Sequence, residues 1–460
     1  MLLCRLSTLL LTAVSLFGKL WAFQSLQIPR TLSSTSSGKS HLFSVQTYQI
    51  DISDDAVRNP NGFLEWANYY GIGTENFQIN AQSNNWGGFS IQAAPVGSRV
   101  LFVPAMLRIT SQTVREQEFA DQQGTIAEFI DSNYSDGDTD IPLACHFYLF
   151  LKILQEYERG DQSAYYQWMD ALPRKFSTAV TFSDFEMDCL PPFVKYLAYK
   201  DRGNYFNFLQ VLNKVQTPSI SDATKRNSEV TLWAFNVVFT RARAVFGEAE
   251  IIPMPDMINH NANPNVEVQY DDEGNVNVIT LRDIQAEEQL YKCYGQPTNP
   301  SRYLATYGFF DSSPPATYCK LYPGLAVTDE LKNMGFCYDR LVFYVENGAI
   351  AEEVWDVVLF LMLLEEADTT VQQQFYNSHM QGDVDTKAQI HQYYMPQTCE
   401  RLMKHVDEVL RELEKCEKTM DAGGMGLVHK NLPMIRRHND FVRQTFTKVK
   451  QNLQQIQQTV

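Results

Sequence analysis

Between Arg241 and Phe310 the chain gathers side chains that can do chemistry. A segment Asp256-x-x-Asn259-His260 is followed by two Tyr-Gly dipeptides, Tyr294-Gly295 and Tyr307-Gly308. Tyrosine hydroxyls and imidazoles can hold or exchange protons at a reacting centre, and an arginine can bind a carboxylate. These residues are the candidate site, provided that the fold brings them together.

A β-hairpin is predicted between the Asn-His pair and the first Tyr-Gly. Apolar and polar residues alternate on both sides of a Gly-containing turn at 271–275, with Val266, Val268 and Tyr270 before it and Val276, Val278 and Thr280 after it. A short helix around Phe63 and Trp66 and a strand-like run at 99–104 precede this region in the chain.

The order of these residues resembles the SET-domain methyltransferases of the Rubisco large-subunit methyltransferase type. The matching segments are Asp256 to His260, Glu287-Glu288-Gln289, Tyr294-Gly295, Asn299 and Tyr307-Gly308-Phe309. The resemblance implies an α+β fold, a SET β-fold with a pseudoknot. It also implies a helical insertion that splits the SET core, and an all-α C-terminal lobe that binds the protein substrate.

The resemblance also implies roles for single residues. Tyr294 matches the catalytic tyrosine, and S-adenosylmethionine is the implied methyl donor. The implied donor-binding residues are Asn85, Trp86, Gly87, Arg241, Asp256, Asn259, His260, Tyr307, Gly308 and Phe309, and the implied substrate-binding residues are Arg241, Tyr307 and Phe310. The family's glycine turn against the donor corresponds to Asn85-Trp86-Gly87, so its first glycine is an asparagine here, a residue that tolerates left-handed dihedrals.

A helical insertion is expected at about 112–245. Its last helix, Leu232 to Arg241, is apolar almost all round and is predicted to be buried. A buried helix with one arginine in its last turn needs an anion for that charge. A carboxylate of the protein satisfies this need, and in the family the matching arginine reaches the donor's carboxylate; the sequence leaves both partners open.

The first 50 residues have the composition of a targeting segment. Arg5 precedes an apolar run from Leu6 to Phe17, which predicts a signal peptide over 1–22, and 23–50 is rich in Ser and Thr without acids, as in a transit peptide. The combination, with Phe23 after the cleavage point, resembles the bipartite plastid presequence of algae with secondary plastids. A secretory signal is the alternative. The expected domains are then a SET domain over 51–311 and the lobe over 320–460.

The charge and the cysteine content of the chain limit which partners, metal sites and disulfides are expected. The formal net charge is −16, and the four cations of residues 1–50 leave −20 for the remainder. Such an acidic chain repels phosphate backbones, so nucleic acid is not expected as a partner, and a basic protein segment is. The eight cysteines are spread out without a Cys-x-x-Cys pair, which predicts neither a zinc site nor a disulfide framework.

The sequence thus predicts a monomeric, S-adenosylmethionine-dependent protein-lysine N-methyltransferase that acts on a non-histone, plastid protein. The mature form is expected to be free of membrane and metal. Two alternatives stay open: a non-catalytic SET-fold module that binds a protein, and a protein-histidine methyltransferase. The departure at Asn85 favours the binding module, and Tyr294 favours an enzyme.

Overall fold

The computed structural model describes residues 47–459 except 54, 83–84, 131–140, 296–299, 313–317, 321–328, 337–339, 366–368 and 424–428. The predicted signal and transit segments and Asn299 therefore lie outside the described residues, apart from 47–50. Ile50 is only 2% exposed, and the Tyr48 carbonyl accepts a hydrogen bond from the Asp161 amide at 3.0 Å. The packed chain thus begins before the predicted boundary at residue 51, because Ser/Thr content does not mark where packing starts.

Short strands in small sheets make up the β part. The elements before the insertion are α1 (Pro60–Tyr69), β1 (Gln78–Gln82), β2 (Asn85–Phe89), β3 (Arg99–Val103), η1 (Ala105–Leu107) and β4 (Ile109–Thr110). Those after it are β5 (Arg243–Val245), β6 (Glu248–Ile251), η6 (Pro255–Met257), β7 (Asn259–His260), β8 (Val266–Tyr270), β9 (Val276–Thr280), β10 (Tyr291–Lys292), α10 (Pro300–Arg302) and η7 (Tyr303–Tyr307).

Two of the sheets, β3-β9-β8 and β4-β6-β5, join segments from distant parts of the sequence. Antiparallel sheets form in the orders β1-β2, β3-β9-β8 and β4-β6-β5, and β7 pairs with β10 in parallel. The predicted hairpin is confirmed, with Val266 opposite Thr280 and Tyr270 opposite Val276. Val266, Val276 and Val278 point into the core while Glu267 and Gln269 stay out, as strict alternation requires.

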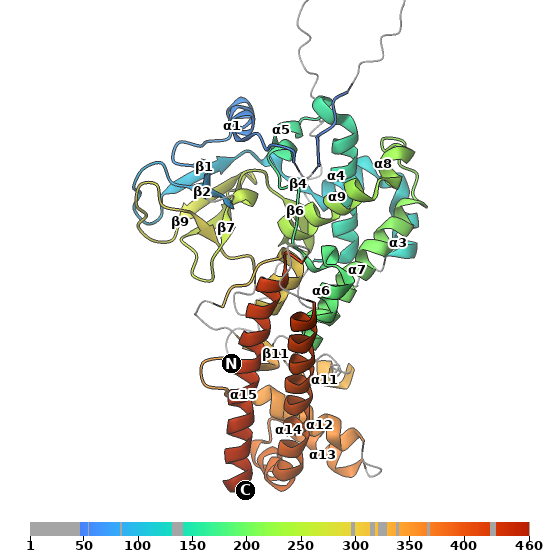
Figure 1. Ribbon diagram of the computed structural model, residues 1–460, viewed down its shortest axis with the longest axis vertical. Helices are drawn as coiled ribbons and strands as arrows, with labels where there is room; N and C mark the ends of the chain where they lie inside the picture. Colours follow the sequence, from blue (N-terminus) through green and yellow to red (C-terminus); the bar gives the residue numbers. More distant parts are fainter. Residues whose placement is uncertain are drawn as a thin grey trace, which may run out of the picture. The chain divides into compact units, whose positions relative to one another are not determined.

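The insertion is helical, as predicted. It contains α2 (Ser111–Thr113), η2 (Val114–Glu118), η3 (Ala120–Gln122), α3 (Gln123–Phe129), α4 (Leu143–Arg159), η4 (Gly160–Gln162), α5 (Tyr166–Asp170), η5 (Ala179–Thr181), α6 (Asp184–Asp188), α7 (Pro192–Leu212), α8 (Asp222–Arg226) and α9 (Ser228–Arg241). In Figure 1 these helices lie on one side of the small sheets. The helices end at Arg241, and residues 243–245 form β5 rather than belonging to the insertion.

Helix α9 sets the position of the first candidate residue. The Asn227 side chain caps it by accepting hydrogen bonds from the Glu229 and Val230 amides. Trp233, Phe235 and most of its other residues are buried, which explains why the helix is apolar on nearly every face. The chain turns extended at Ala242, so Arg241 stands in the last turn, at the edge of the core.

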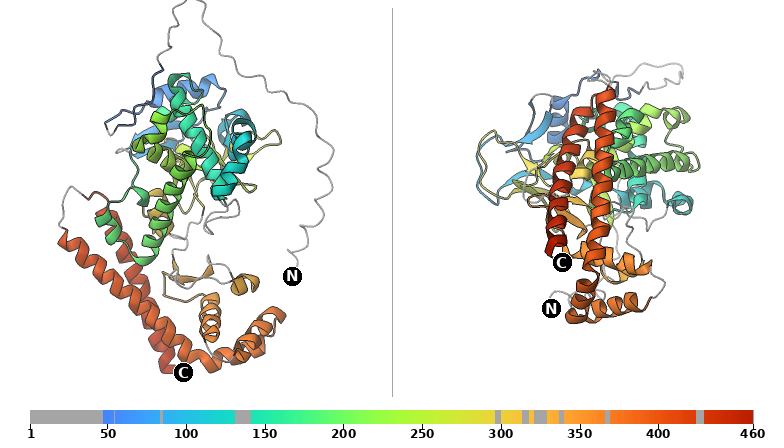
Figure 2. Two further views of the ribbon diagram at one scale, coloured as in Figure 1. Left: turned by 90° about the vertical axis from the view of Figure 1, so that its right-hand side faces the viewer. Right: turned by 60° about the horizontal axis from the view of Figure 1, so that its bottom comes forward.

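The C-terminal lobe is mainly helical. It contains β11 (Tyr318–Lys320), α11 (Asp329–Asn333), β12 (Val342–Tyr344), α12 (Glu352–Leu364), α13 (Thr370–Gln381), α14 (Val384–Ala422) and α15 (Leu432–Thr459). Figures 1 and 2 show α14 and α15 side by side. The lobe was expected to be all-α, and the structure adds the antiparallel pair β11-β12. Strands of three residues are too short to be predicted from alternating apolar and polar residues.

A separate apolar cluster joins the lobe to the rest of the chain. It combines Met187 and Leu197 of the insertion and Leu304 of η7 with Met420 of α14 and Ile435 of α15, all almost fully buried. Burial of one such side chain stabilises a fold by roughly 1.5–3 kcal/mol. Because η7 also lines the candidate site, the lobe is packed directly behind it.

Candidate active site

The parallel pair β7-β10 brings the Asn-His and Tyr-Gly motifs together. Asn259 lies opposite Tyr291 and His260 opposite Lys292. The Tyr294 amide then donates to Nδ1 of His260 at 3.2 Å, and the Tyr294 hydroxyl donates to the Ile258 carbonyl at 2.9 Å. The two motifs are therefore joined by hydrogen bonds of both backbone and side chain.

His260 is a neutral, structural imidazole in this arrangement. Its Nδ1 accepts a hydrogen bond, so the proton of the neutral ring is on Nε2, which lies 3.5 Å from Oδ2 of Asp311. Burial lowers the pKa of His260, and Asp311 opposes that shift. The ring packs among Tyr294, Tyr303 and Phe309 at centroid distances of 5.3, 4.4 and 5.5 Å. Its contacts thus hold the backbone and the ring of Tyr294.

Arg241 finds the anion that its buried position requires. Its Nη1 lies 3.6 Å from Oδ2 of Asp256 and donates to the Asp256 carbonyl at 2.9 Å. Trp168 Nε1 donates to the same carboxylate at 3.0 Å. Burial raises the pKa of Asp256, and Arg241 opposes the rise. Among the described groups, Asp256 Oδ1 and Arg241 Nε are buried without a hydrogen-bond partner, so each keeps capacity for a ligand.

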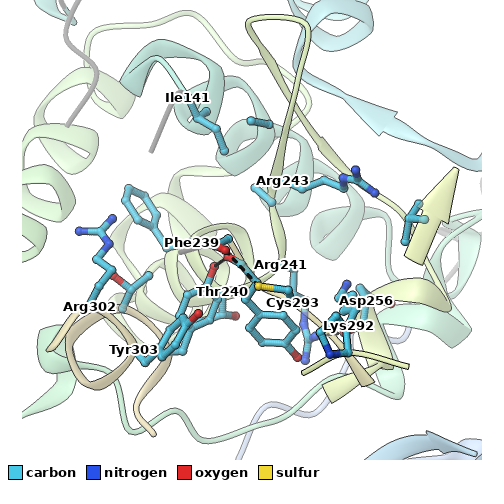
Figure 3. A pocket seen from close by; sticks show the side chains of 18 of the residues that line it. Ile141, Phe239, Thr240, Arg241, Arg243, Asp256, Lys292, Cys293, Arg302 and Tyr303 are labelled. Atoms are coloured by element: carbon cyan, nitrogen blue, oxygen red, sulfur yellow. Dashed lines mark hydrogen bonds and ion pairs between the residues drawn. The ribbon is translucent and has the colours of Figure 1, made fainter. Parts of the chain in front are cut away.

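Two cavities meet at these residues. The first, of about 520 Å³, is lined by Trp86, Asn259, His260, Gly308, Phe309 and others. The second, of about 700 Å³, is lined by Lys292, Cys293, Tyr303 and residues of α9, β5 and β8; Figure 3 shows part of it. They share Thr240, Arg241, Asp256, Tyr294 and Tyr307. A molecule in one cavity and a molecule in the other would thus face each other at Tyr294.

The segment Asn85-Trp86-Gly87 differs from the prediction. It was expected to turn, and instead it is extended in β2, opposite Gln82 to Asn80. Gly87 is still needed for close approach, since a Cβ there would lie 2.6 Å from Nε2 of Gln289 and 2.8 Å from Nδ2 of Asn259. The Asn259 amide donates to the Trp86 carbonyl at 3.0 Å. Trp86 thus lines the first cavity through a strand, because β1 supplies a pairing partner.

The predicted site residues between Tyr307 and Phe310 lie in different surroundings. Tyr307, in the last turn of η7, lines both cavities, and its ring centroid lies 5.1 Å from that of Tyr294. Gly308 has φ of 73°, and a Cβ there would collide with the Ser177 backbone. Phe310 lines neither cavity. It packs against His438 and Phe441 of α15, with ring centroids 5.5 Å apart in each case, and its role as a substrate contact stays a prediction.

The structure adds residues that the sequence did not suggest. Arg58 lies 3.8 Å over the Trp86 ring and lines the first cavity, where burial and then Arg241 lower its pKa to about 9, so it stays charged at neutral pH. Lys292 Nζ donates to the Pro255 carbonyl at 2.8 Å, and burial lowers its pKa to about 8. Arg58 lies far in the sequence from every motif, so no pattern in the sequence indicated it. Lys292 stands two residues before Tyr294, and a charged residue in a strand next to the motif was the available signal.

Neither a metal cluster nor a membrane span is found in the described part of the chain. No group of three or more His, Cys, Asp or Glu side chains there could hold a metal ion. No helix described is both long and apolar enough to cross a bilayer. The five cysteines whose side chains are described, Cys145, Cys189, Cys293, Cys399 and Cys416, are all free thiols.

Residues 85–295 match the model of the SET domain. This chain contains a SET domain. The chain has the fold of two solved structures: Rubisco LSMT bound to AdoMet (TM-score 0.62, 14% identity, 87% of this chain and 92% of that one) and the SET domain of LSMT bound to Lysine and AdoHcy (TM-score 0.62, 14%, 86% and 91%). The predicted fold class is thereby confirmed.

Among curated relatives, the chain is similar to the actin-histidine N-methyltransferases of Mus musculus and Gallus gallus. The identity is 22% and 23% over 290 residues, which is 59% of this chain. The match spans 46% of either relative, so this chain aligns with about half the length of those proteins. The matched SET region, 85–295, contains the lining residues of the two cavities from Trp86 to Gly295, and Arg58 lies before it.

Proposed function

We propose that this chain is an S-adenosylmethionine-dependent protein N-methyltransferase that modifies lysine. The observation that carries the proposal is the meeting of two cavities at Tyr294, with Arg241 and Asp256 shared between them. One cavity can then hold a donor and the other a side chain of a protein. Similarity to Rubisco LSMT, whose structures are described with AdoMet and with lysine, supports both halves of this assignment.

The residues of the first cavity fit the donor. An amino-acid end carries a carboxylate and an ammonium, and the cavity offers Arg241 Nε for the first and Asp256 Oδ1 for the second, both buried and unpartnered among the described groups. Arg58 adds a second cation near Trp86. The rings of Tyr294, Tyr307 and Phe309 offer faces that attract a sulfonium. When bound, S-adenosylmethionine supplies an electrophilic methyl group.

The chain's own residues must make the acceptor amine neutral and aim it. A free lysine has a pKa near 10.4, so only about one amine in a thousand is neutral at pH 7.4. Burial beside Arg241 and Lys292 disfavours a further positive charge, which lowers that pKa. Tyr294 holds the line of approach, because its backbone amide is bonded to His260, its ring packs on that imidazole, and its hydroxyl is bonded to the Ile258 carbonyl.

Histidine is the second candidate for the target residue. The curated relatives with the SET match are actin-histidine methyltransferases. An imidazole is largely neutral at pH 7.4, so it has less need of cationic neighbours than lysine has. The presence of Arg241, Arg243 and Lys292 around the second cavity favours lysine for this chain. Mass spectrometry of the product separates the two, since it locates the added methyl group on one residue.

Donor binding and transfer are tested separately. In calorimetry the full chain should bind S-adenosylmethionine 1:1, and Asn259→Ala should weaken binding at least tenfold, because Asn259 holds the Trp86 carbonyl. Incubation with isotope-labelled donor and a protein extract, followed by mass spectrometry, should then place label on a lysine. Binding without transfer would favour the non-catalytic binding module, and the absence of binding at millimolar donor would end the enzyme proposal.

We propose a plastid location and a plastid protein as substrate. The support is the composition of residues 1–50, with Phe23 after the predicted signal cleavage point. A fluorescent protein fused to these residues should enter a plastid, and Phe23→Ala should divert the fusion to the endomembrane system. Secretion of the unmodified fusion would replace this proposal by the secretory alternative.

A further inference from the structure

The second cavity carries an excess of positive charge. Its lining includes four cationic side chains (Arg241, Arg243, Lys292 and Arg302) and two carboxylates (Asp256 and Glu267). This sign is unexpected in a chain whose formal net charge is −16. Local charge, not net charge, decides which group a cavity attracts at contact distance.

Arg243 stands apart from the reacting centre. In Figure 3 it lies away from the cluster formed by Arg241, Asp256 and Lys292. It belongs to β5, directly after the turn that ends α9, whereas Tyr294 follows β10. A group bound at Arg243 would therefore be a neighbour of the target side chain in the substrate, not the target itself.

The surroundings of Arg243 hold its guanidinium in place without using its donors. Glu250, whose side chain is fully buried, already accepts from Arg108 Nε at 2.8 Å and from the Tyr270 hydroxyl. Arg243 Nε is farther from it, at 3.8 Å, and the guanidinium lies over the Tyr270 ring at 5.5 Å. The Arg243 side chain makes no hydrogen bond with any described residue and is 37% exposed.

We propose that Arg243 is a carboxylate-binding subsite that selects substrates with an aspartate or glutamate close to the methylated residue, an inference that rests on the proposed function. A planar guanidinium that lies over a ring loses little freedom when it binds a planar carboxylate, and two parallel N–H···O bonds match that geometry. Of the two acids of the cavity wall, Glu267 lies on the exposed face of β8 and Asp256 pairs with Arg241. The substrate carboxylate would supply the anion that Glu250, at 3.8 Å, supplies only in part.

The test uses synthetic 15-residue peptides. Each has a central lysine, or histidine in a parallel set, and one flanking position at a time carries glutamate, glutamine or lysine. The full chain is assayed for methyl transfer with S-adenosylmethionine and, independently, for peptide binding by fluorescence anisotropy without donor. At one or two flanking positions the glutamate peptide should bind and react at least tenfold better than the glutamine peptide, the scale of one charge-assisted hydrogen-bonded pair.

Charge exchange separates recognition from a purely structural role. Arg243→Ala should abolish the glutamate preference, and Arg243→Glu should reverse it in favour of the lysine-flanked peptide, which loss of stability cannot do. Arg226→Ala is the matched control, since that arginine is 80% exposed on α8 and lines neither cavity. Equal binding of glutamate and glutamine peptides overturns the subsite while leaving the proposed function intact. Failure to methylate any peptide or protein would contradict the proposed function. The subsite would then still be tested by the anisotropy measurement of peptide binding.

Discussion

The phenol oxygen of Tyr294 has one hydrogen bond, to the Ile258 carbonyl, and burial raises the pKa of this phenol, so it is protonated at any physiological pH. A protonated hydroxyl at the junction of two cavities can orient reacting groups but cannot act as an anionic base. We therefore expect a positioning role for its oxygen. The ring has a separate role in packing against His260 and Tyr307.

The variant Tyr294→Phe keeps that ring and removes the oxygen. Donor binding measured by calorimetry should stay near the wild-type value, while single-turnover methyl transfer should fall by a factor of about 10²–10³, as for loss of one preorganised polar group. Tyr199→Phe, on the exposed side of α7, is the control for a lost phenol elsewhere. Full turnover with reduced stability would instead assign Tyr294 to packing and make Tyr307 the next candidate.

Gly87 tests the close approach of β2 to the donor cavity. In Gly87→Ala the new methyl group would displace the side chains of Gln289 and Asn259, which lie 2.6 and 2.8 Å from it. We expect at least tenfold weaker donor binding in calorimetry. Gly203→Ala is the matched control, because no atom lies within 4 Å of a Cβ there and the helix should gain about 0.4–1 kcal/mol. Unchanged donor affinity in Gly87→Ala would show that this contact is not functional.

At the scale of elements, the periodicity of apolar and polar residues predicted the local secondary structure. The hairpin β8-β9, the buried helix α9 and the helices of the lobe follow from alternation and from apolar runs. Pairing between distant segments was not readable. Arg58 was missed because only the fold brings it over Trp86. A different cause applies to Asn85, which was assigned to a turn because the neighbouring strand β1 gave no signal in the sequence. The packing of Phe310 on α15 was likewise not readable from the aromatic run.

Helix α15 contributes an acid-sensitive contact to the fold. His438 is fully buried, its Nε2 lies 3.0 Å from the Ser301 hydroxyl of α10, and burial lowers its pKa to about 3. In the unfolded chain the pKa is near 6.5. The folded pKa is thus the lower one, so below pH 6.5 the unfolded state binds a proton that the folded state refuses. The stability present above pH 6.5 is lost as the pH falls toward 3.

Replacement of this imidazole should flatten the response to acid. Between pH 7.5 and 5.5, His438→Gln should lose about 1.4 kcal/mol less unfolding free energy than the wild type, the value for one group about one pH unit below its unfolded pKa. Glutamine can still bond to Ser301. Urea denaturation at both pH values measures the difference, and equal slopes in the two proteins would place the acid sensitivity elsewhere.

For the whole molecule, the chemistry proposed here requires a bound donor and a cavity for the acceptor side chain, and no metal. We expect methyl transfer to persist in millimolar EDTA and 1,10-phenanthroline, and elemental analysis of the purified full chain to find less than one zinc per chain. Stoichiometric zinc that is lost together with activity would show that the spread cysteines had been misread.

The hydrogen bonds that join the β7 and β10 region to Trp86 and Ser90 also bear on how the chain folds. The site requires Asn259 to reach the Trp86 carbonyl, 173 residues earlier in the sequence, and the Glu288 amide to reach the Ser90 hydroxyl, 198 residues earlier. The helices of the insertion and the hairpin β8-β9 close through local contacts, whereas these links wait for long loops to close, and such contacts form slowly. In refolding, helical circular dichroism should therefore return before donor binding does, which leaves an interval in which the chain is compact and still catalytically incompetent.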